Sequence, residues 1–359
     1  MKVSRVEITP YVWQLPVSVT TARGTYFERS AWRVALHSDD GRVGWGEAAP
    51  LDGQGTESLQ SARDALGAAE RMLPGLEVPA QWQSLEEAAF LPRTSPGARY
   101  AIELALLDLM AQRVDRPIAG MLAQDAAFEI RVNGLLAGTE IPALVAEAQL
   151  AVDAGYQTLK MKVGVMSPAQ DVERVNAVRN GVGPNVRLRI DANGVWSLPL
   201  ATQMLQALEG AQLELAEQPV SAAAWSAWSE LRLQTQTPLA ADESLREPHF
   251  AQALWGDGAR KVDFVVLKPM LLGGLLPSLA IARNARRAGV EPIVTHSWDG
   301  AVGQLGALHL AAALRCSVAC GLSPDTLALS TSFREGRLSV PRAPGLGYSG
   351  DVPVVETWS

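Results

Sequence analysis

The stretch Thr158-Leu159-Lys160-Met161-Lys162-Val163 predicts a buried β-strand that carries two lysines. Alternate residues of a strand point to the same side, so Lys160 and Lys162 share one face. Burying two ammonium groups without counter-charges is strongly unfavourable. The strand therefore predicts that acidic groups face these lysines and that the pair has a function.

Acidic residues follow at regular intervals along the chain. Asp191 lies in Arg-Ile-Asp-Ala-Asn-Gly, Glu217 in Ala-Glu-Gln-Pro and Asp242 in Ala-Asp-Glu-Ser, each at the end of a β-prone run. They are 26 and 25 positions apart, and Lys268, in Val-Val-Leu-Lys-Pro, follows 26 positions later. Three converging carboxylates repel one another unless a cation lies between them. Oxygen ligands without His or Cys select a hard ion, so the sequence predicts Mg²⁺, with Mn²⁺ as the second choice.

The spacing indicates a repeated strand–helix unit from about residue 130 onward. Helical periodicity between the β-prone runs, as at 141–154 and 169–178, supports this unit. Eight such runs favour a closed parallel barrel over an open sheet. The predicted strands are Ile130–Leu135, Thr158–Val163, Val186–Asp191, Leu213–Glu217, Pro238–Asp242, Val262–Lys268, Pro292–His296 and Ser317–Leu322.

The residues before the barrel have a different pattern. Val3–Trp13 and Ala31–Gly46 are predicted to be long antiparallel strands, and Ser58–Leu73 and Gly97–Val114 to be amphipathic helices. We therefore expect an α+β capping domain at 1–127, a (β/α) barrel catalytic domain at 128–322 and a C-terminal segment at 323–359 that returns to the cap.

Composition excludes several classes of protein. The 359 residues carry a net charge of −7 and no Lys/Arg-rich block, which argues against a nucleic-acid surface. The N-terminus lacks the pattern of a signal peptide, and no apolar stretch is long enough to span a bilayer. Only two cysteines are present, Cys316 and Cys320, so we expect a reducing cytoplasm. Since nucleic acids and membranes are not expected as partners, we expect a small-molecule carboxylate as the substrate.

The charged set indicates proton transfer beside a carboxylate. Removing a proton from the α-carbon gives an enediolate with two negative oxygens, which a divalent cation stabilises as a Lewis acid. Lysine must be neutral to act as the base, and nearby positive charge disfavours the ammonium form. The alternative is that lysine–carboxylate salt bridges fill the barrel without a metal.

At these residues the sequence resembles the muconate-lactonizing subgroup of the enolase superfamily. The motifs are Lys160-Met-Lys162, Asp191-Ala-Asn193 and Glu217-Gln-Pro219, followed by Asp242 and Lys268. Gly44-Trp-Gly-Glu-Ala-Ala-Pro50 and Pro344-Gly-Leu-Gly347 look like the cap and the tail of that family. The resemblance implies a modified (β/α)₇β barrel of the TIM type under an α+β cap. It also implies metal ligands at Asp191, Glu217 and Asp242, and catalytic lysines at 162, 268 and 160.

Within the subgroup, Val265–Gly274 and 301–313 resemble the o-succinylbenzoate synthases. That resemblance implies syn dehydration of a cyclohexadiene carboxylate in the menaquinone pathway. Arg189 resembles part of an Arg-x-Asp that orients substrate in some synthases, although simple charge balance explains it equally well. Asn193 and Ser297 are further candidates for substrate binding.

Other functions stay open at this point. N-acylamino acid racemase and muconate cycloisomerase keep the same lysines and acids, and the racemase is the first alternative. Dipeptide epimerases carry an Asp-x-Asp near the last strand that holds the substrate ammonium group, whereas this chain has Cys320-Gly-Leu-Ser-Pro-Asp325. A carboxylate-binding protein without catalysis would not need lysines on both sides of its ligand. The sequence alone does not define the oligomeric state.

Overall fold

Seven of the eight strands predicted for the barrel contribute to one curled parallel sheet, the first of them, Ile130–Leu135, only through its C-terminal end. The computed structural model describes residues 1–350 except 22–23, 53–54, 87, 257–259 and 328–330. The sheet has seven strands in the order β11-β10-β9-β8-β7-β6-β5, so strands that are consecutive along the chain are neighbours. Their bounds are β5 Gly134–Leu136, β6 Thr158–Lys162, β7 Arg187–Asp191, β8 Leu215–Glu217, β9 Leu239–Ala241, β10 Phe264–Leu267 and β11 Glu291–Val294.

The eighth position is filled by single bridges rather than by a strand. Cys320 bridges in parallel to Val132, and Gly321 bridges to Thr295. The bonds are Asn133 N–H to the Cys320 carbonyl at 3.0 Å and Gly321 N–H to the Val294 carbonyl at 2.9 Å. These bridges close the ring. In place of the strand predicted at Ser317–Leu322, only Cys320 and Gly321 form bridges to the neighbouring segments. In a ring of eight positions, β6 and β10 lie on opposite sides.

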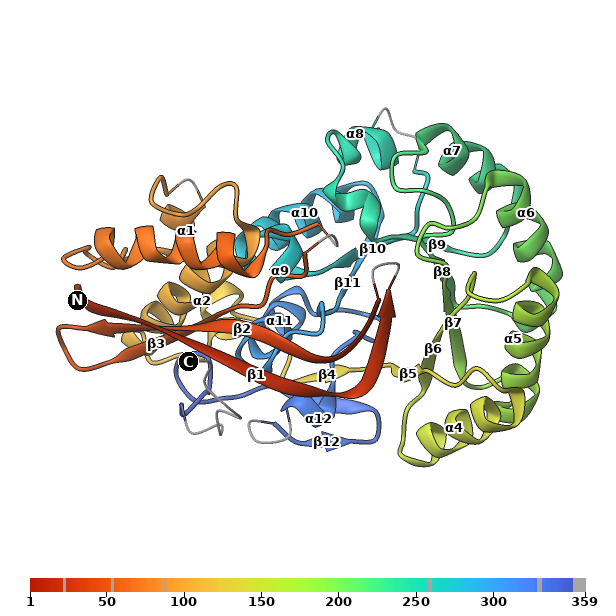
Figure 1. The fold of residues 1–359 in the computed structure, drawn as a ribbon, viewed down its shortest axis with the longest axis horizontal. Helices are drawn as coiled ribbons and strands as arrows, with labels where there is room; N and C mark the ends of the chain where they lie inside the picture. The colour runs from red at the N-terminus through yellow and green to blue at the C-terminus, as the bar shows by residue number, and fades with distance from the viewer. Residues whose placement is uncertain (22–23, 53–54, 87, 257–259, 328–330, 351–359) are drawn as a thin grey trace.

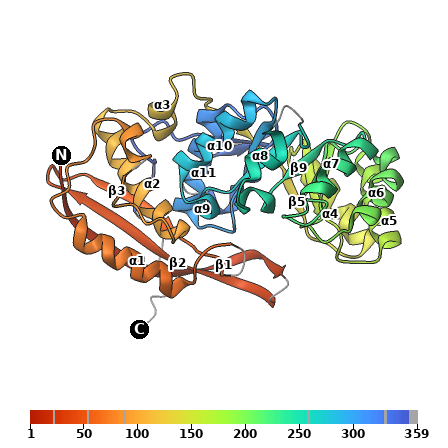
Figure 2. The ribbon, with the colours of Figure 1, turned by 90° about the horizontal axis from the view of Figure 1, so that it is seen from above.

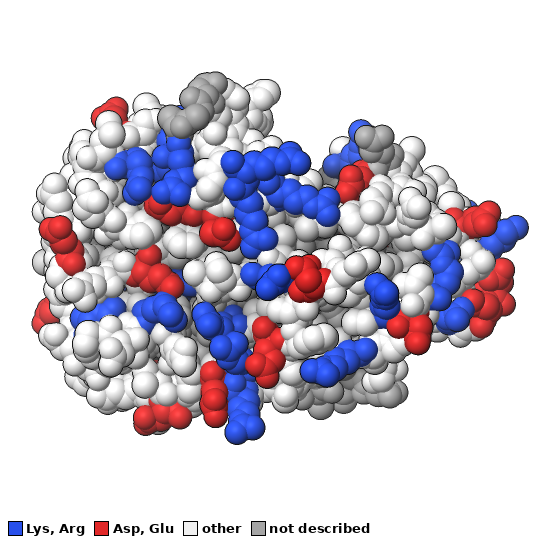
Figure 3. Space-filling view, turned by 180° about the vertical axis from the view of Figure 1, so that it is seen from behind, with Lys and Arg blue, Asp and Glu red and all other residues white. Residues whose placement is uncertain are grey.

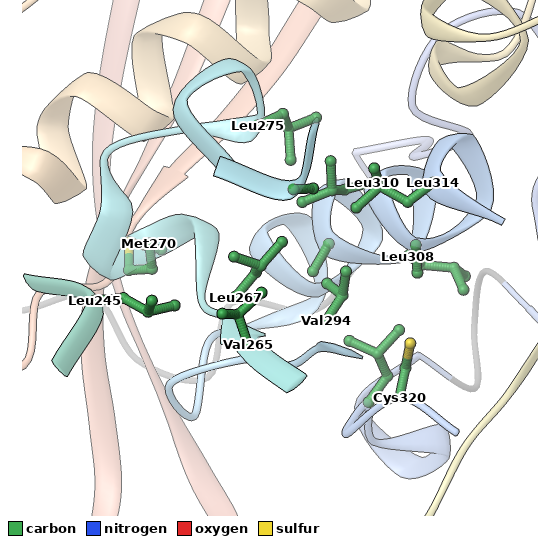
Figure 4. Packing of buried hydrophobic residues seen from close by; sticks show 14 of the residues in the cluster. Leu245, Val265, Leu267, Met270, Leu275, Val294, Leu308, Leu310, Leu314 and Cys320 are labelled. Carbon is green, nitrogen blue, oxygen red and sulfur yellow. The ribbon is translucent and has the colours of Figure 1, made fainter. Parts of the chain in front are cut away.

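Helices cover the outside of the ring. The outward side chains of the strands pack against them: Figure 4 shows Val265 and Leu267 of β10 close to Val294 of β11, in the same buried cluster as Leu308 of α11. Leu215, Ala240, Val266 and Ile293 form a separate cluster. They alternate with the outward residues, so they face the interior of the ring. The helices are α4 Ile141–Asp153, α5 Pro168–Val182, α6 Leu198–Ala207, α7 Trp225–Gln234, α8 Phe250–Trp255, α9 Pro269–Leu272, α10 Leu275–Arg287 and α11 Ala301–Leu314.

The N-terminal module is a three-stranded antiparallel sheet with two helices, which Figure 1 shows beside the barrel. Its elements are β1 Val3–Thr21, β2 Gly24–Ser38, β3 Val43–Ala48, α1 Leu59–Met72 and α2 Pro96–Arg113. The single strand predicted at Ala31–Gly46 is wrong, because a turn with Gly41 at φ +86° divides it into β2 and β3. A Cβ at Gly44 or Gly46 would overlap carbonyls of α2, so these glycines let the helix lie directly on β3.

The C-terminal residues contact both parts of the molecule. β12 Phe333–Arg334 and β13 Arg337–Ser339 form a hairpin that pairs with β4 Glu129–Arg131. Gly345 bridges to Pro117 just before α3 Ile118–Leu122, while the Tyr348 ring packs edge-on against Trp45 of β3. The short helix α12 Pro324–Leu327 precedes the hairpin. Figure 2 shows α2 and α3 on the side of the molecule away from α5 and α6.

Surface charges of both signs are interspersed on the face seen in Figure 3. Among the residues described, no helix is long and apolar enough to cross a bilayer.

Candidate active site

Three carboxylates stand at one edge of the parallel sheet. Asp191 ends β7, Glu217 ends β8 and Asp242 directly follows β9. The ladder places Lys162 level with Asp191, and Asp191 level with Glu217. All three acids are buried, with 4%, 3% and 4% of their surfaces exposed. The carboxyl ends of parallel strands meet at this edge, which is why acids one strand–helix unit apart in sequence become neighbours.

Lys160 and Lys268 neutralise these carboxylates. The Lys160 Nζ lies 2.9 Å from Asp191 Oδ2 and 2.6 Å from Glu217 Oε1. The Lys268 Nζ donates to Asp242 Oδ2. Burial alone would lower the pKa of each lysine, but the adjacent carboxylates outweigh burial and raise it above the usual value. Both side chains are therefore ammonium ions in this arrangement.

Lys162 differs from Lys160 and Lys268 because it has no acidic partner among the described residues. In the part of the chain that the structure describes, no carboxylate lies within ion-pair distance of its Nζ. Its backbone carbonyl accepts from Arg174 Nη1 at 3.3 Å, which ties the end of β6 to α5. Lys162 ends β6, and Lys268 directly follows β10 on the opposite side of the ring. Strand alternation assigns both residues to the interior face.

The donor chemistry of the acidic cluster fits a hard divalent cation. Burial, followed by the charges of Asp191 and Asp242, raises the pKa of Glu217 to about 8, so negative charge is crowded here even with the lysines in place. Within the described ranges, however, no three Asp, Glu, His or Cys side chains already converge on one point. Lys160 bridges Asp191 and Glu217, which is the arrangement of the salt-bridge alternative, and an ion at these carboxylates would compete with this lysine.

The Glu217-Gln-Pro segment locks the neighbouring strand ends together. Gln218 Oε1 accepts from the N–H groups of Asp242, at 2.9 Å, and Ser244, at 3.2 Å. Its Nε2 donates to Ser244 Oγ and to the Val220 carbonyl. Sequence reasoning singled out the motif but did not assign this role to the glutamine. It fixes the backbone of the acid that follows β9 relative to β8.

The structure places Asn193 at the rim of the acidic cluster. Its N–H donates to Asp191 Oδ1 at 3.0 Å, and its Nδ2 donates to Glu243 Oε1 at 3.1 Å. Its backbone is left-handed, with φ +44°, a conformation that Asn tolerates better than most residues. Asn193 therefore orients Asp191 and links β7 to the loop after β9.

Arg189 lies one layer deeper than the carboxylates and has protein partners there. Its Nε donates to Glu214 Oε2 at 2.6 Å, and its Nη1 donates to the Ala319 carbonyl at 2.8 Å. Only 1% of its surface is exposed. The counter-charge of Arg189 is thus Glu214, below the site, and this geometry favours a structural role over substrate orientation.

The loop after β11 brings Ser297 to the same end of the ring. Ser297 is buried in this loop, with 4% of its surface exposed. His296 Nδ1 accepts a hydrogen bond from the Trp298 backbone N–H at 3.0 Å, and the His296 and Trp298 rings pack edge to face. Burial, together with the charges of Lys268 and Lys160, lowers the pKa of His296 to about 3, so this imidazole is neutral. An uncharged aromatic pair therefore borders the lysines.

A closed parallel sheet with acids and lysines at its carboxyl edge defines a (β/α)-barrel enzyme. The sequence comparisons identify the family to which this barrel enzyme belongs. The chain belongs to the mandelate racemase/muconate lactonizing enzyme family of the enolase superfamily: residues 4–123 match its N-terminal domain, and residues 143–353 match the family described as enolase C-terminal domain-like. The resemblance drawn from the lysine and acid motifs is thereby confirmed at the level of the superfamily.

Relatives of known function cover nearly the whole chain. The L-Ala-D/L-Glu epimerase of Bacillus subtilis is 30% identical over 98% of this chain and 97% of its own length. The N-succinyl-L-Arg/Lys racemase of Bacillus cereus is 28% identical over 87% of this chain and 84% of its own. The structure of a dipeptide epimerase from Enterococcus faecalis, complexed with Mg and the dipeptide L-Leu-L-Tyr, superposes with a TM-score of 0.84. It has 28% identity and covers 97% of this chain and 99% of its own.

Proposed function

We propose that this enzyme racemises or epimerises a small carboxylate by moving the proton on its α-carbon, with an acylated amino acid as the substrate class. The observation that carries the proposal is the pair of lysines on opposite sides of the ring, Lys162 and Lys268. Reversal of a stereocentre requires proton removal on one face and proton delivery on the other. Two lysines on opposed strands meet that requirement.

The two lysines differ in a way that suits these roles. Lys162 has no acidic partner among the described residues, so it is free to take the α-proton. Lys268 is bonded to Asp242 and held as an ammonium ion, so it is ready to deliver a proton from the other side. Lys160 adds positive charge beside Lys162 and near the substrate carboxylate. In the reverse direction the roles of Lys162 and Lys268 exchange.

Asp191, Glu217 and Asp242 would hold the divalent cation, Mg²⁺ first and Mn²⁺ second. Once bound, the ion would stabilise the negative charge that develops on the carboxylate oxygens. The support is the donor set: three buried carboxylates on neighbouring strand ends, without a His or Cys ligand. Asn193 would orient Asp191, and Ser297 would contact the substrate from the loop after β11.

We infer acylation of the substrate nitrogen from the residues at the last strand position of the barrel. The region in which dipeptide epimerases carry Asp-x-Asp reads Cys320-Gly-Leu-Ser-Pro-Asp325 here, without that motif to balance a free ammonium group. The N-succinyl racemase acts, by its name, on substrates with an acylated nitrogen. These two points favour an N-acyl substrate over a free dipeptide.

The second candidate is the synthase chemistry implied by the motif resemblance, in which a cyclohexadiene carboxylate is dehydrated to an aromatic product. One structural observation favours it: the neutral His296–Trp298 pair beside the lysines suits a flat ring. The relatives described above are an epimerase and a racemase, so they favour the first proposal.

Product analysis distinguishes the racemase proposal from the synthase proposal. The enzyme is incubated with Mg²⁺ and a panel of N-acetyl and N-succinyl L-amino acids, and chiral chromatography follows the D-isomers. A parallel reaction with the cyclohexadiene substrate is monitored by ultraviolet absorbance. D-isomer formation that EDTA abolishes and Mg²⁺ restores supports the racemase. Aromatic product without any D-isomer would replace it with the synthase, and turnover that persists after rigorous chelation would contradict the metal site.

A further inference from the structure

A carboxylate of the N-terminal module holds a loop of the barrel. Glu47 of β3 accepts from the N–H of Gly300 at 2.7 Å and from the N–H of Gly303 at 3.2 Å. Tyr11 of β1 donates its hydroxyl to the same carboxylate. Glu47 is completely buried. Gly300 is the N-cap of α11, so Glu47 supplies the acceptor that the first turn of this helix lacks within itself.

The contact depends on a close approach of the two parts. A Cβ at Gly303 would lie 2.8 Å from Glu47 Oε1, and a Cβ at Gly300 would overlap the Tyr11 hydroxyl. Both glycines therefore leave space for the carboxylate. Tyr100 of α2 adds a bond of 2.7 Å from its hydroxyl to the Gly303 carbonyl. The first turn of α11 is thus held directly by two side chains of the N-terminal module, Glu47 and Tyr100, and Tyr11 holds Glu47.

The loop that Glu47 anchors carries two buried polar atoms without partners in the described structure. They are Ser297 Oγ and Asp299 Oδ2. Asp299 Oδ1 accepts from Ser297 N–H at 3.3 Å, and Gln304 of α11 donates to the Asp299 carbonyl at 2.9 Å. A continuous series of hydrogen bonds therefore connects Glu47, through the first turn of α11 and Asp299, to the backbone of Ser297. A buried hydroxyl without a partner, in the loop that follows the carboxyl end of β11, is available to a ligand.

We propose that Glu47 is a positioning residue of this enzyme: by fixing the first turn of α11, it sets the place of the Ser297 hydroxyl against the substrate. The inference rests on the proposed function in one respect, since it takes Ser297 as a substrate contact. Through this bond Glu47 acts on the active site indirectly, by holding the β11–α11 loop. Small displacements of such a group weaken catalysis strongly, because a shift of about 1 Å can cost about 10²-fold in rate.

Asp108 provides a matched control. It is also a buried carboxylate of the N-terminal module, and it accepts from two backbone N–H groups, those of Trp45 at 2.9 Å and Leu346 at 2.8 Å. Its partners, which also include Gln112 Nε2 at 2.8 Å, belong to β3, α2 and the C-terminal residues, not to an active-site loop. Loss of charge at Asp108 therefore removes a comparable structural contact without releasing Ser297.

The test compares Glu47→Gln and Asp108→Asn with the wild-type enzyme by two measurements. Hydrogen–deuterium exchange, read by mass spectrometry on peptides covering 295–303, reports on the loop without requiring activity. Steady-state kinetics on the N-acylamino acid that the wild type turns over best reports on catalysis. Ser297→Ala, alone and combined with Glu47→Gln, completes a double-mutant cycle. Tyr11→Phe, which removes one donor to Glu47, serves as a milder variant if Glu47→Gln does not fold.

The expected result is specific to Glu47. Glu47→Gln should accelerate exchange in 295–303 and lower kcat/KM by at least about tenfold, and Ser297→Ala should add little to it. Tyr11→Phe should show the same changes at smaller size, and Asp108→Asn should leave both readouts near wild type. Unchanged loop exchange, fully additive losses with Ser297→Ala, or equal losses in Asp108→Asn would each overturn the inference. If the wild type turns over no N-acylamino acid, the proposed function fails, and the exchange data alone then decide whether Glu47 fixes the loop.

Discussion

Replacing Lys160 by methionine tests whether the buried carboxylates are a cation site. Methionine keeps much of the side-chain volume but removes the ammonium group that lies 2.9 Å from Asp191 and 2.6 Å from Glu217. Breaking a buried ion pair by removing one partner typically costs about 3–5 kcal/mol, because the remaining charge is left uncompensated. We expect Lys160→Met to lose free energy of unfolding in that range when EDTA is present.

Magnesium should offset part of this loss. An ion at 100 times its Kd stabilises a folded protein by about 2.7 kcal/mol. Lys160 competes with the ion for Asp191 and Glu217, and two unit charges 4 Å apart interact by about 4 kcal/mol at an effective dielectric constant of 20. Even a quarter of that value makes the gain from Mg²⁺ about 1 kcal/mol larger in Lys160→Met than in the wild type.

The assay is urea unfolding with saturating MgCl₂ or with EDTA, at matched ionic strength. Arg174→Met is the control, since it breaks another buried pair, Arg174 to Asp171 at 2.8 Å, on α5. That variant should lose stability but gain no more from Mg²⁺ than the wild type. If Lys160→Met gains no more from Mg²⁺ than Arg174→Met does, the carboxylates do not bind the ion in the way proposed.

Three further predictions concern single side chains. Lys162→Ala should lower turnover by at least about 10³-fold, the scale of a positioned acid–base group, with little change in Tm; near wild-type turnover would remove Lys162 from the mechanism. Lys268→Arg keeps the charge but shuttles protons poorly, so racemisation should stop; retained racemisation would contradict the two-base scheme, whereas retained dehydration alone would favour the synthase. Glu103 accepts from Leu276 N–H at 3.0 Å, and burial raises its pKa to about 7. The folded state therefore binds this proton more tightly than the unfolded state, and the resulting stability is present below pH 4.5 and is lost as pH rises through 7. Removal of this ionisable group in Glu103→Gln should abolish that part of the pH dependence, worth at most about 3 kcal/mol in urea unfolding at pH 5 and pH 8; an identical pH dependence in the variant and the wild type would contradict the raised pKa.

The sequence was sufficient for the barrel and for the placement of the acids, because both follow from periodicity. Strand–helix units of nearly constant length bring the ends of successive strands to one edge. Asp191, Glu217 and Asp242 therefore stand at the same edge of the sheet, although their side chains do not converge on one point in the described structure. The turn between β2 and β3 was missed, although Asp39-Asp-Gly41 is a turn signal and Gly41 adopts the left-handed conformation that such a turn requires.

The pairing of charges was not predictable from periodicity. Lys160 and Lys162 share a strand face, and only their depth in the ring decides that Lys160 reaches the carboxylates. Arg189 was matched with the acids above it, but its partner Glu214 directly precedes the neighbouring strand β8, below them. The bond from Glu47 to Gly300 spans 253 residues, so no local pattern announces it. The motif around Glu47 was visible in the sequence, but its barrel partner was not.

The measurement that tests the proposed function most directly is exchange of the α-proton with solvent. The enzyme is incubated in deuterated water with Mg²⁺ and an N-acylamino acid, and the α-hydrogen is followed by proton nuclear magnetic resonance. We predict that deuterium enters the α-position, that the other stereoisomer accumulates, and that Lys162→Ala abolishes both. Efficient formation of aromatic product from the cyclohexadiene, with no deuterium entering any N-acylamino acid tested, would contradict the racemase assignment.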